Sequence, residues 1–177
     1  MEKEFLTLVN NRQSCRDFND LPIDRETLEK IVEIGRLAPS ACNSQPWKMY
    51  VVTDEEKRAK VCPTLQDCFM NKFVDKAKAF IVLAETGATL KERIIAKFTS
   101  KHFVKYDIGE LTAYLTLGAE SLGVSSCIIG WVNEKKLKDV LSIPQQESVA
   151  IVIALGYSDI EKRPKVRKDK ELVIKYV

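Results

Sequence analysis

The stretch APSACNSQPW, from Ala38 to Trp47, stands between a helical pattern and a strand pattern and decides how the chain is interpreted. Its small side chains would let the backbone approach a flat ring closely, and its amides offer donors and acceptors for the edge of a heterocycle. An ordinary loop between a helix and a strand, with Trp47 in the core, would use the same residues. Taken alone, the stretch supports a ligand site and a simple loop equally.

Regular elements are predicted on both sides of this stretch. Before it, apolar residues at helical spacing predict a helix over 24–37, with Asp24 as its N-cap. After it, WKMYVVTD (47–54) predicts a strand, and the last aspartate of that strand is expected to cap a further helix over 55–62. The stretch therefore connects the first predicted helix to the first predicted strand.

The rest of the chain continues to mix helices and strands. The run from Asp107 to Leu122 is apolar nearly all round, which predicts a buried central helix capped by Asp107 and ended by Gly123. Residues 86–105 have a weak pattern that fits one amphipathic helix. The remaining predicted elements are strands over 78–85, 125–131 and 148–157 and a helix over 133–141. This mixture predicts an α+β or α/β sheet covered by helices.

The composition is typical of a globular protein. The chain has 177 residues, 45% of them hydrophobic, which suffices for one well-buried domain. Its net charge of +3 is far below the positive field expected of a nucleic-acid-binding protein. The N-terminus lacks the apolar core of a signal peptide, and no stretch approaches the ~18 apolar residues that span a bilayer. We therefore expect a soluble, cytoplasmic protein that binds neither membrane nor nucleic acid.

The cysteines and the single histidine argue against several classes of enzyme. Five cysteines make an odd number in a chain without an export signal, so we expect free thiols. No CxxC pair occurs and His102 is the only histidine, so a zinc site lacks ligands at usable spacing. A Ser-His or Cys-His nucleophile would depend on His102 alone. We therefore expect no metal enzyme and no hydrolase of this kind.

Two basic segments lie near the ends of the chain. Arg12-Gln13-Ser14-Cys15-Arg16 follows a short predicted helix, and its alternation places two guanidinium groups and a hydroxyl on one side. Guanidinium matches phosphate bidentately, so the segment suits a phosphate clamp, although two surface arginines in a loop are the simpler explanation. KRPKVRKDK (162–170) carries six positive charges and one negative charge. A solvated tail is the usual meaning of such a run.

Together, the RxSxR of residues 12–16 and the APSAxNxQPW of residues 38–47 resemble the nitroreductase family of FMN enzymes. The likeness covers nearly the whole chain, because the central helix, the strand SSCIIG, the strand ending in LGY and the late basic run follow in the family's order. It implies an α+β fold with a central mixed, mainly antiparallel sheet flanked by helices. It also implies a homodimer, in which residues 1–177 form one FMN-binding domain and residues 158–177 extend along the partner subunit.

The resemblance implies a cofactor site that two subunits share. The phosphate, ribityl chain and pyrimidine edge of FMN would be held by Arg12, Ser14 and Arg16 and by the backbone at Gln13. The segment that the other subunit lays against the isoalloxazine ring would comprise Pro39, Ser40, Ala41 and Asn43. The family's remaining FMN contacts fall on Ile129 and Gly130 at a strand end, on Lys165 and Arg167 at the phosphate, and on Asn71, which aligns loosely with a ring-contacting amide.

Two departures from the family's pattern restrict what the resemblance implies. Cys42 stands where the family often has glycine or another small residue, and we interpret it as a filler rather than a redox thiol. The segment 86–105 is short, whereas longer relatives build the substrate side of the pocket there. The sequence therefore specifies neither the physiological acceptor nor the choice between NADH and NADPH.

The implied reaction needs no catalytic side chain and no metal, because the flavin itself carries the electrons. The resemblance implies an FMN-dependent oxidoreductase that transfers electrons from NADH or NADPH to a small acceptor, such as a nitroaromatic or a quinone, by a ping-pong mechanism. Three alternatives stay open. They are a relative with other flavin chemistry (reductive dehalogenation or flavin breakdown), a non-catalytic FMN-binding protein, and a nucleic-acid-binding module built on residues 162–170.

Overall fold

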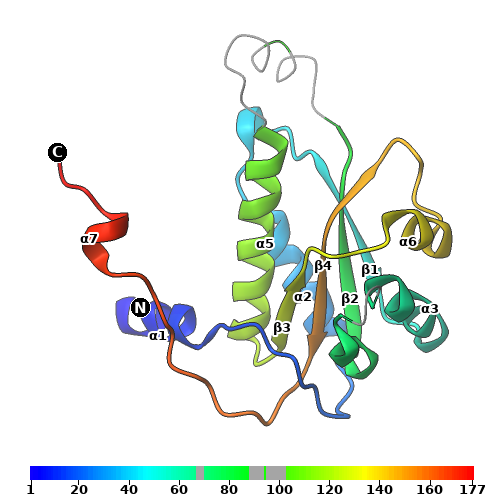
Figure 1. Cartoon of the computed structure of the whole chain (residues 1–177), viewed down its shortest axis with the longest axis horizontal. Coiled ribbons are helices and arrows are strands. Elements are labelled where there is room, and N and C mark those ends of the chain that lie inside the picture. The colour runs from blue at the N-terminus through cyan, green and yellow to red at the C-terminus, as the bar shows by residue number, and fades with distance from the viewer. Residues whose placement is uncertain (67–69, 88–93, 95–102) are drawn as a thin grey trace.

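The computed structural model describes residues 1–66, 70–87, 94 and 103–177 (Figure 1). Its helices are α1 (Glu2–Asn11), α2 (Arg25–Arg36), α3 (Glu55–Leu65), α5 (Phe103–Ser121), α6 (Glu134–Leu141) and α7 (Lys170–Val173), with the short 3-10 helices η1 (Ala41–Asn43) and η3 (Lys72–Lys76). Its strands are β1 (Trp47–Val52), β2 (Ala79–Glu85), β3 (Ser125–Ile129) and β4 (Ser148–Gly156). The helix expected within 86–105 falls largely, and His102 entirely, outside the described residues.

The strands form one sheet in the order β1-β2-β4-β3, in which every neighbouring pair is antiparallel. Strands β2 and β4 are central in this order, and helices cover both of their faces. Their nearly continuous apolar sequences agree with this burial. A parallel bridge joins Ser14 to Ser126 on the free edge of β3. The sheet is therefore mixed but mainly antiparallel, which confirms the predicted fold class.

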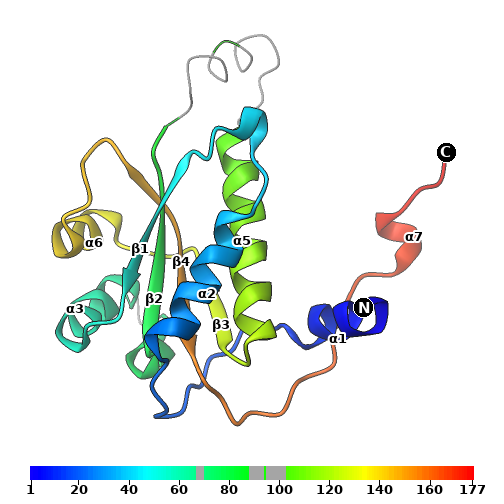
Figure 2. The same ribbon diagram turned by 180° about the vertical axis from the view of Figure 1, so that it is seen from behind.

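Helices cover both faces of the sheet, with α2 and α5 on one side and α3 and α6 on the other (Figure 2). Alternate residues of β2 enter the two cores, because successive side chains of a strand point to opposite faces. Phe80 and Val82 pack with α3 and α6, whereas Ile81 and Leu83 pack with α2 and α5. All of these side chains are fully buried.

The predicted central helix is confirmed as α5, which crosses α2 at close range. A Cβ atom at Gly118 would lie 2.9 Å from Cγ2 of Ile34, and one at Gly35 would clash with Leu115. The two glycines therefore let the helix backbones approach closely. Although α5 is strongly apolar, no helix in the described part of the chain is long and apolar enough to cross a membrane.

Two of the predicted helix caps are confirmed and one is wrong. Asp24 and Asp54 each accept a hydrogen bond from a backbone N–H in the first turn of the following helix, at 2.8 and 2.9 Å. Asp107 does not cap α5, because the helix begins one turn earlier, at Phe103. Its buried carboxylate instead accepts a hydrogen bond at 3.0 Å from the backbone N–H of Ala41, so Asp107 holds a distant loop.

The C-terminal segment that ends in α7 stands away from these layers, and α1 lies beside the end of α5 (Figure 1). Neither α1 nor α7 contains a buried residue, so both helices lack the packed face that usually stabilises a helix in a protein. Large apolar side chains are exposed on these ends, among them Phe5, Leu6, Val9, Leu172, Ile174 and Tyr176. The terminal segments therefore carry apolar surface that this one chain does not cover.

Candidate functional site

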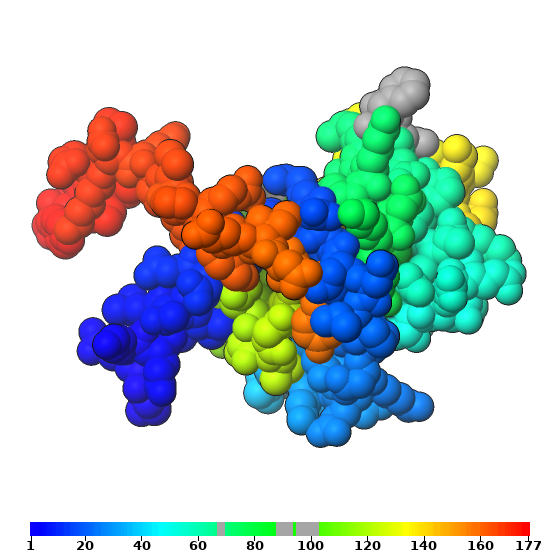
Figure 3. All heavy atoms as spheres, turned by 90° about the horizontal axis from the view of Figure 1, so that it is seen from below, coloured from blue at the N-terminus to red at the C-terminus, as the bar shows by residue number. Residues whose placement is uncertain are grey.

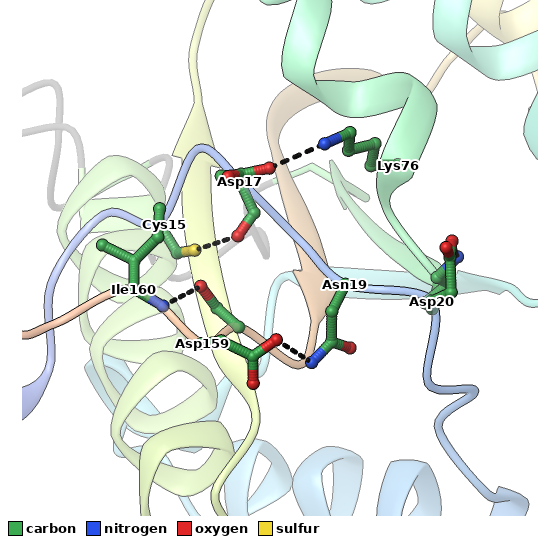
Figure 4. Close-up of polar contacts among 9 residues, drawn as sticks. Cys15, Asp17, Asn19, Asp20, Lys76, Asp159 and Ile160 are labelled. Atoms are coloured by element: carbon green, nitrogen blue, oxygen red, sulfur yellow. Dashed lines mark hydrogen bonds and ion pairs between the residues drawn. The ribbon is translucent and has the colours of Figure 1, made fainter.

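Residues 12–16 lie at the free edge of β3, where α1 ends and extended chain begins. Arg12 is the first residue after α1, and the backbone N–H of Cys15 donates a hydrogen bond to the carbonyl of Ser126 at 2.9 Å. The chain then crosses the end of the sheet, where Asn19 hydrogen-bonds to Asp159 at 3.0 Å (Figure 4). Segments from the two ends of the sequence thus lie side by side.

The late basic run returns to the same place. Lys165 Nζ donates to the carbonyl of Arg12 at 2.7 Å, and the guanidinium of Arg163 donates to Gln13 Oε1 at 3.4 Å and to the carbonyl of Ser14 at 3.3 Å. We call residues 12–16 together with residues 162–167 the cationic junction. Figure 3 shows its two segments, blue and orange, adjoining on the underside of the molecule. The prediction that basic residues from both ends of the chain meet agrees with this arrangement.

Positive charge is concentrated at the cationic junction. Burial lowers the pKa of Arg12, and burial together with repulsion from Arg167 and Arg12 lowers the pKa of Lys165. Within the described residues, the guanidinium groups of Arg12 and Arg16 make no hydrogen bond or ion pair. Crowded cations, two of them without a hydrogen bond or ion pair of their own, are the arrangement expected of an anion-binding site.

A cavity of about 220 Å³ opens between the two segments of the junction. Its lining includes Gln13, Ser14, Arg16 and Arg163, together with the hydroxyl residues Ser125 and Ser158. Arg12, Lys165 and Arg167 do not line this cavity, so the cations of the junction surround it only in part.

The stretch 38–47 forms a loop with an unusual backbone, which we call the strained loop. Cys42, Asn43 and Gln45 all have positive φ angles, 54°, 53° and 46°. This left-handed region is disfavoured for residues other than glycine, and it occurs preferentially at functional sites. Glycine would adopt the φ angle of Cys42 without strain.

Hydrogen bonds hold the strained loop in shape. Ser40 Oγ accepts from the backbone N–H of Gln45 at 3.0 Å, and Asp107 on α5 accepts from Ala41 N. Pro39 and Asn43 are exposed, and Ser40 and Ala41 are partly exposed. Trp47, at the end of the loop, packs against the α2 and α5 core. The loop therefore presents small side chains outward from a fixed backbone, while its tryptophan belongs to the core.

The two predicted halves of the site do not meet within one chain. The strained loop is hydrogen-bonded to Asp107 near the start of α5. The cationic junction contacts the last turn of the same helix, where Lys162 pairs with Glu120. At about 1.5 Å per residue, Asp107 and Glu120 lie about 20 Å apart along the helix. One chain therefore carries the halves at opposite ends of α5.

The other predicted residues belong to neither half. Ile129 is buried at the end of β3, and Gly130 beside it is exposed, with nothing within 4 Å of the position of a Cβ atom. Asn71 has a positive φ of 54°, and its side-chain nitrogen donates to the carbonyl of Leu65 at 2.9 Å. That hydrogen bond fixes the end of α3, and the cofactor role of Asn71 stays a prediction.

Sequence reasoning missed three residues that shape this region. Arg163 binds Gln13 and Ser14, Asp107 anchors the strained loop, and Glu120 pairs with the late basic run. Arg163 could have been found, because it belongs to the basic run that was singled out. The anchoring and pairing roles of Asp107 and Glu120 have no local signal, since their partners are far away in the sequence.

Known proteins with related sequences have redox functions. The family model described as the nitroreductase family matches residues 9–72 and 64–157. A protein of Archaeoglobus fulgidus, provisionally named NADH dehydrogenase/NAD(P)H nitroreductase, is 31% identical over 164 residues, which cover 90% of this chain and 88% of that protein. The oxygen-insensitive NADPH nitroreductase of Helicobacter pylori is 27% identical over 194 residues, covering 92% and 91% of the two chains.

Solved structures agree with these sequence matches. An FMN-dependent nitroreductase from Clostridium difficile matches with a TM-score of 0.79 and 25% identity, over 97% of this chain and 98% of that one. A nitroreductase family protein from Streptococcus pneumoniae matches with a TM-score of 0.83 and 25% identity, over 98% and 100% of the two chains. Sequence and fold therefore lead to one assignment: the chain belongs to the nitroreductase family.

Proposed function

We propose that this protein is a homodimeric, FMN-dependent oxidoreductase that takes electrons from NADH or NADPH and passes them to a small acceptor, such as a nitroaromatic or a quinone, in ping-pong turnover. The names of its relatives, one an FMN-dependent and another an NADPH nitroreductase, support the cofactor and the donor. The observation that carries the proposal is the separation of the cationic junction from the strained loop. Two chains related by a two-fold axis would complete two sites from these halves.

The residues of the cationic junction fit the phosphate of FMN. The guanidinium groups of Arg12 and Arg16 make no hydrogen bond or ion pair within the described residues, and Lys165 lies beside Arg12. A phosphate would offset both the burial and the repulsion from Arg167 and Arg12 that lower the pKa of Lys165. At the end of β3, the open space at Gly130 would admit a flat ring against the backbone.

The protein's own groups would bind and orient rather than react. FMN, when bound, supplies the electron transfer itself, with its ring accepting a hydride from the nicotinamide. The cations of the junction would hold the phosphate, and the strained loop of the partner chain would cover the ring and exclude water. The described residues of the junction and the strained loop include no histidine, which agrees with a reaction that needs no side-chain base.

The terminal segments support the homodimer. Exposed apolar side chains on α1 and on the segment 158–177 form surface that a second copy would cover. In our proposal the segment 158–177 extends along the partner subunit. Dimerisation would then stabilise the terminal helices and complete the cofactor sites together.

The proposal is tested by spectra of the purified protein before and after anaerobic addition of NADH or NADPH. We expect a yellow protein whose flavin absorbance bleaches with at least one donor and returns when a nitroaromatic or quinone is added. Bound flavin that neither donor reduces would support a non-catalytic FMN-binding protein. Reduced flavin that none of these acceptors reoxidises would support other flavin chemistry.

Sedimentation tests the shared site. We expect a dimer, and we expect FMN affinity to fall when the protein is diluted below the dimer dissociation constant. A monomer that binds FMN tightly would contradict the shared site while leaving the redox chemistry open.

A further inference from the structure

The carboxylate of Glu120 lies among the cations of the cationic junction. Its side chain is only 12% exposed, and both of its oxygens bind Lys162 Nζ, at 2.9 and 3.0 Å. Its negative charge also acts to raise the pKa values of Arg12 and Lys165, opposing the burial that lowers them. Glu120 thus interacts with three cations from both segments of the junction.

The position of Glu120 on its helix is unfavourable for a carboxylate. It lies in the last turn of α5, where the carbonyl ends of the helix create a partial negative charge. A negative side chain at this end of a helix is destabilising unless cations compensate for it. The surrounding lysines and Arg12 provide that compensation, so the acid and the cations depend on each other.

We propose that Glu120 is an internal counter-charge that weakens and thereby sets the affinity of the cationic junction for the phosphate of FMN; this inference rests on the function proposed above. Without flavin, the carboxylate offsets the mutual repulsion of Arg12, Lys165 and Arg167. With flavin bound, it repels the phosphate and competes for the same cations. Glu120 is therefore an affinity-setting residue that acts through its neighbours and does not take part in the reaction.

A purely structural role for Glu120 predicts the opposite effect. If the carboxylate only fastened Lys162 and the late basic run, its removal would loosen the junction and weaken FMN binding. Removal of Lys162 would then have the same effect, because both changes break the same ion pair. As a counter-charge, however, Glu120 and Lys162 influence phosphate binding with opposite signs. The two substitutions therefore separate the two roles.

The test compares dissociation constants for FMN and riboflavin at low ionic strength, measured by flavin fluorescence. We expect Glu120→Gln to bind FMN about tenfold more tightly than the unsubstituted protein, and Lys162→Gln to bind it several-fold more weakly. Riboflavin, which lacks the phosphate, should bind equally to all three proteins. The gain for Glu120→Gln should shrink as salt is added, because ions screen partly exposed charges.

A matched control comes from the same helix. Glu110 is exposed on α5, and Glu110→Gln changes the net charge by the same amount without touching the cationic junction. We expect this variant to bind FMN like the unsubstituted protein. Glu120→Ala also removes the charge, so it carries the same expectation as Glu120→Gln should the glutamine variant fold poorly.

The outcomes separate this inference from the proposed function. If the unsubstituted protein binds no FMN, or binds FMN no better than riboflavin, the assignment of the junction to phosphate is wrong. If it prefers FMN but both Glu120→Gln and Lys162→Gln weaken FMN binding, the proposed function stands and the counter-charge role is overturned. Equal tightening of FMN and riboflavin by Glu120→Gln would also overturn it.

Discussion

The cationic junction and the strained loop are built in different ways. The junction joins residues 12–16 to residues 162–167 through hydrogen bonds such as Lys165 Nζ to the Arg12 carbonyl, at 2.7 Å. The strained loop is nearly continuous in sequence and is held mostly by its own groups, such as Ser40 Oγ with Gln45 N. The charged site thus combines residues from distant parts of the chain. The conformation of the loop, in contrast, is specified by one short stretch of sequence.

The two regions also store unfavourable energy in different forms. At the junction the cost is electrostatic, because Arg12 and Arg167 both repel Lys165. In the loop the cost is conformational, since each left-handed residue such as Cys42 costs roughly 1–2 kcal/mol. An anionic ligand would relieve the first cost but not the second. Ligand binding should therefore be most sensitive to changes at the junction, and protein stability to changes at the loop.

The largest expected effect is at the junction. Arg16→Glu replaces a phosphate-matching cation by a repulsive carboxylate on the wall of the cavity, so FMN affinity should fall by at least about 100-fold. Equilibrium dialysis against FMN would measure this loss of affinity. Arg25→Glu is the matched control, because this exposed position at the start of α2 tolerates an acid. An unchanged flavin content in the Arg16 variant would contradict the clamp.

The next effect tests the anchor of the strained loop. Asp107→Ala removes a buried acceptor and leaves the N–H of Ala41 without it, so the free energy of unfolding should fall by about 1–3 kcal/mol in urea denaturation. Asp107→Asn keeps an acceptor oxygen and should cost less. FMN and riboflavin should lose affinity by similar factors, because in our proposal the loop covers the flavin ring, which both ligands share. A selective loss of FMN would place Asp107 with the phosphate instead.

Local features were predictable from the sequence because their causes are local. Asp24 and Asp54 cap the helices that follow them. The sequence patterns also predict the four strands of the sheet, with boundaries correct to within a few residues. The same local reasoning failed at Asp107, where an acid beside an apolar run has the pattern of a cap. Its true partner, Ala41, lies in another element, and no periodicity links the two residues.

The sequence predicted the residue types of the candidate site but not their arrangement in space. The alternation of Arg12, Ser14 and Arg16 indicated a phosphate clamp, and the junction brings Lys165 to the first of these residues. Nothing in the pattern indicated that Glu120 would lie among these cations, since this pairing depends on where α5 ends. The left-handed angle of Cys42 was also hidden, because cysteine has no preference for that conformation.

A smaller effect separates the two flavins at the junction. Lys165→Gln removes one proposed partner of the phosphate, so FMN should bind about tenfold more weakly, or about 1.4 kcal/mol, while riboflavin affinity stays unchanged. Lys168→Gln, an exposed neighbour in the same run, is the control for net charge. Burial and nearby cations lower the pKa of Lys165, so FMN affinity should begin to fall with rising pH below the usual lysine range. Equal losses for both flavins would assign Lys165 to the fold rather than to the phosphate.

The smallest effect isolates the backbone cost in the strained loop. Cys42→Gly should stabilise the protein by about 0.5 kcal/mol, because glycine adopts a φ of 54° without strain but loses more chain entropy on folding. Cys42→Ala removes the thiol and keeps the strain, so it should give no such gain. Urea denaturation of both variants would measure the difference. If alanine stabilised as much as glycine, the thiol rather than the backbone would be the source of the cost, and the loop would not be strained at this residue.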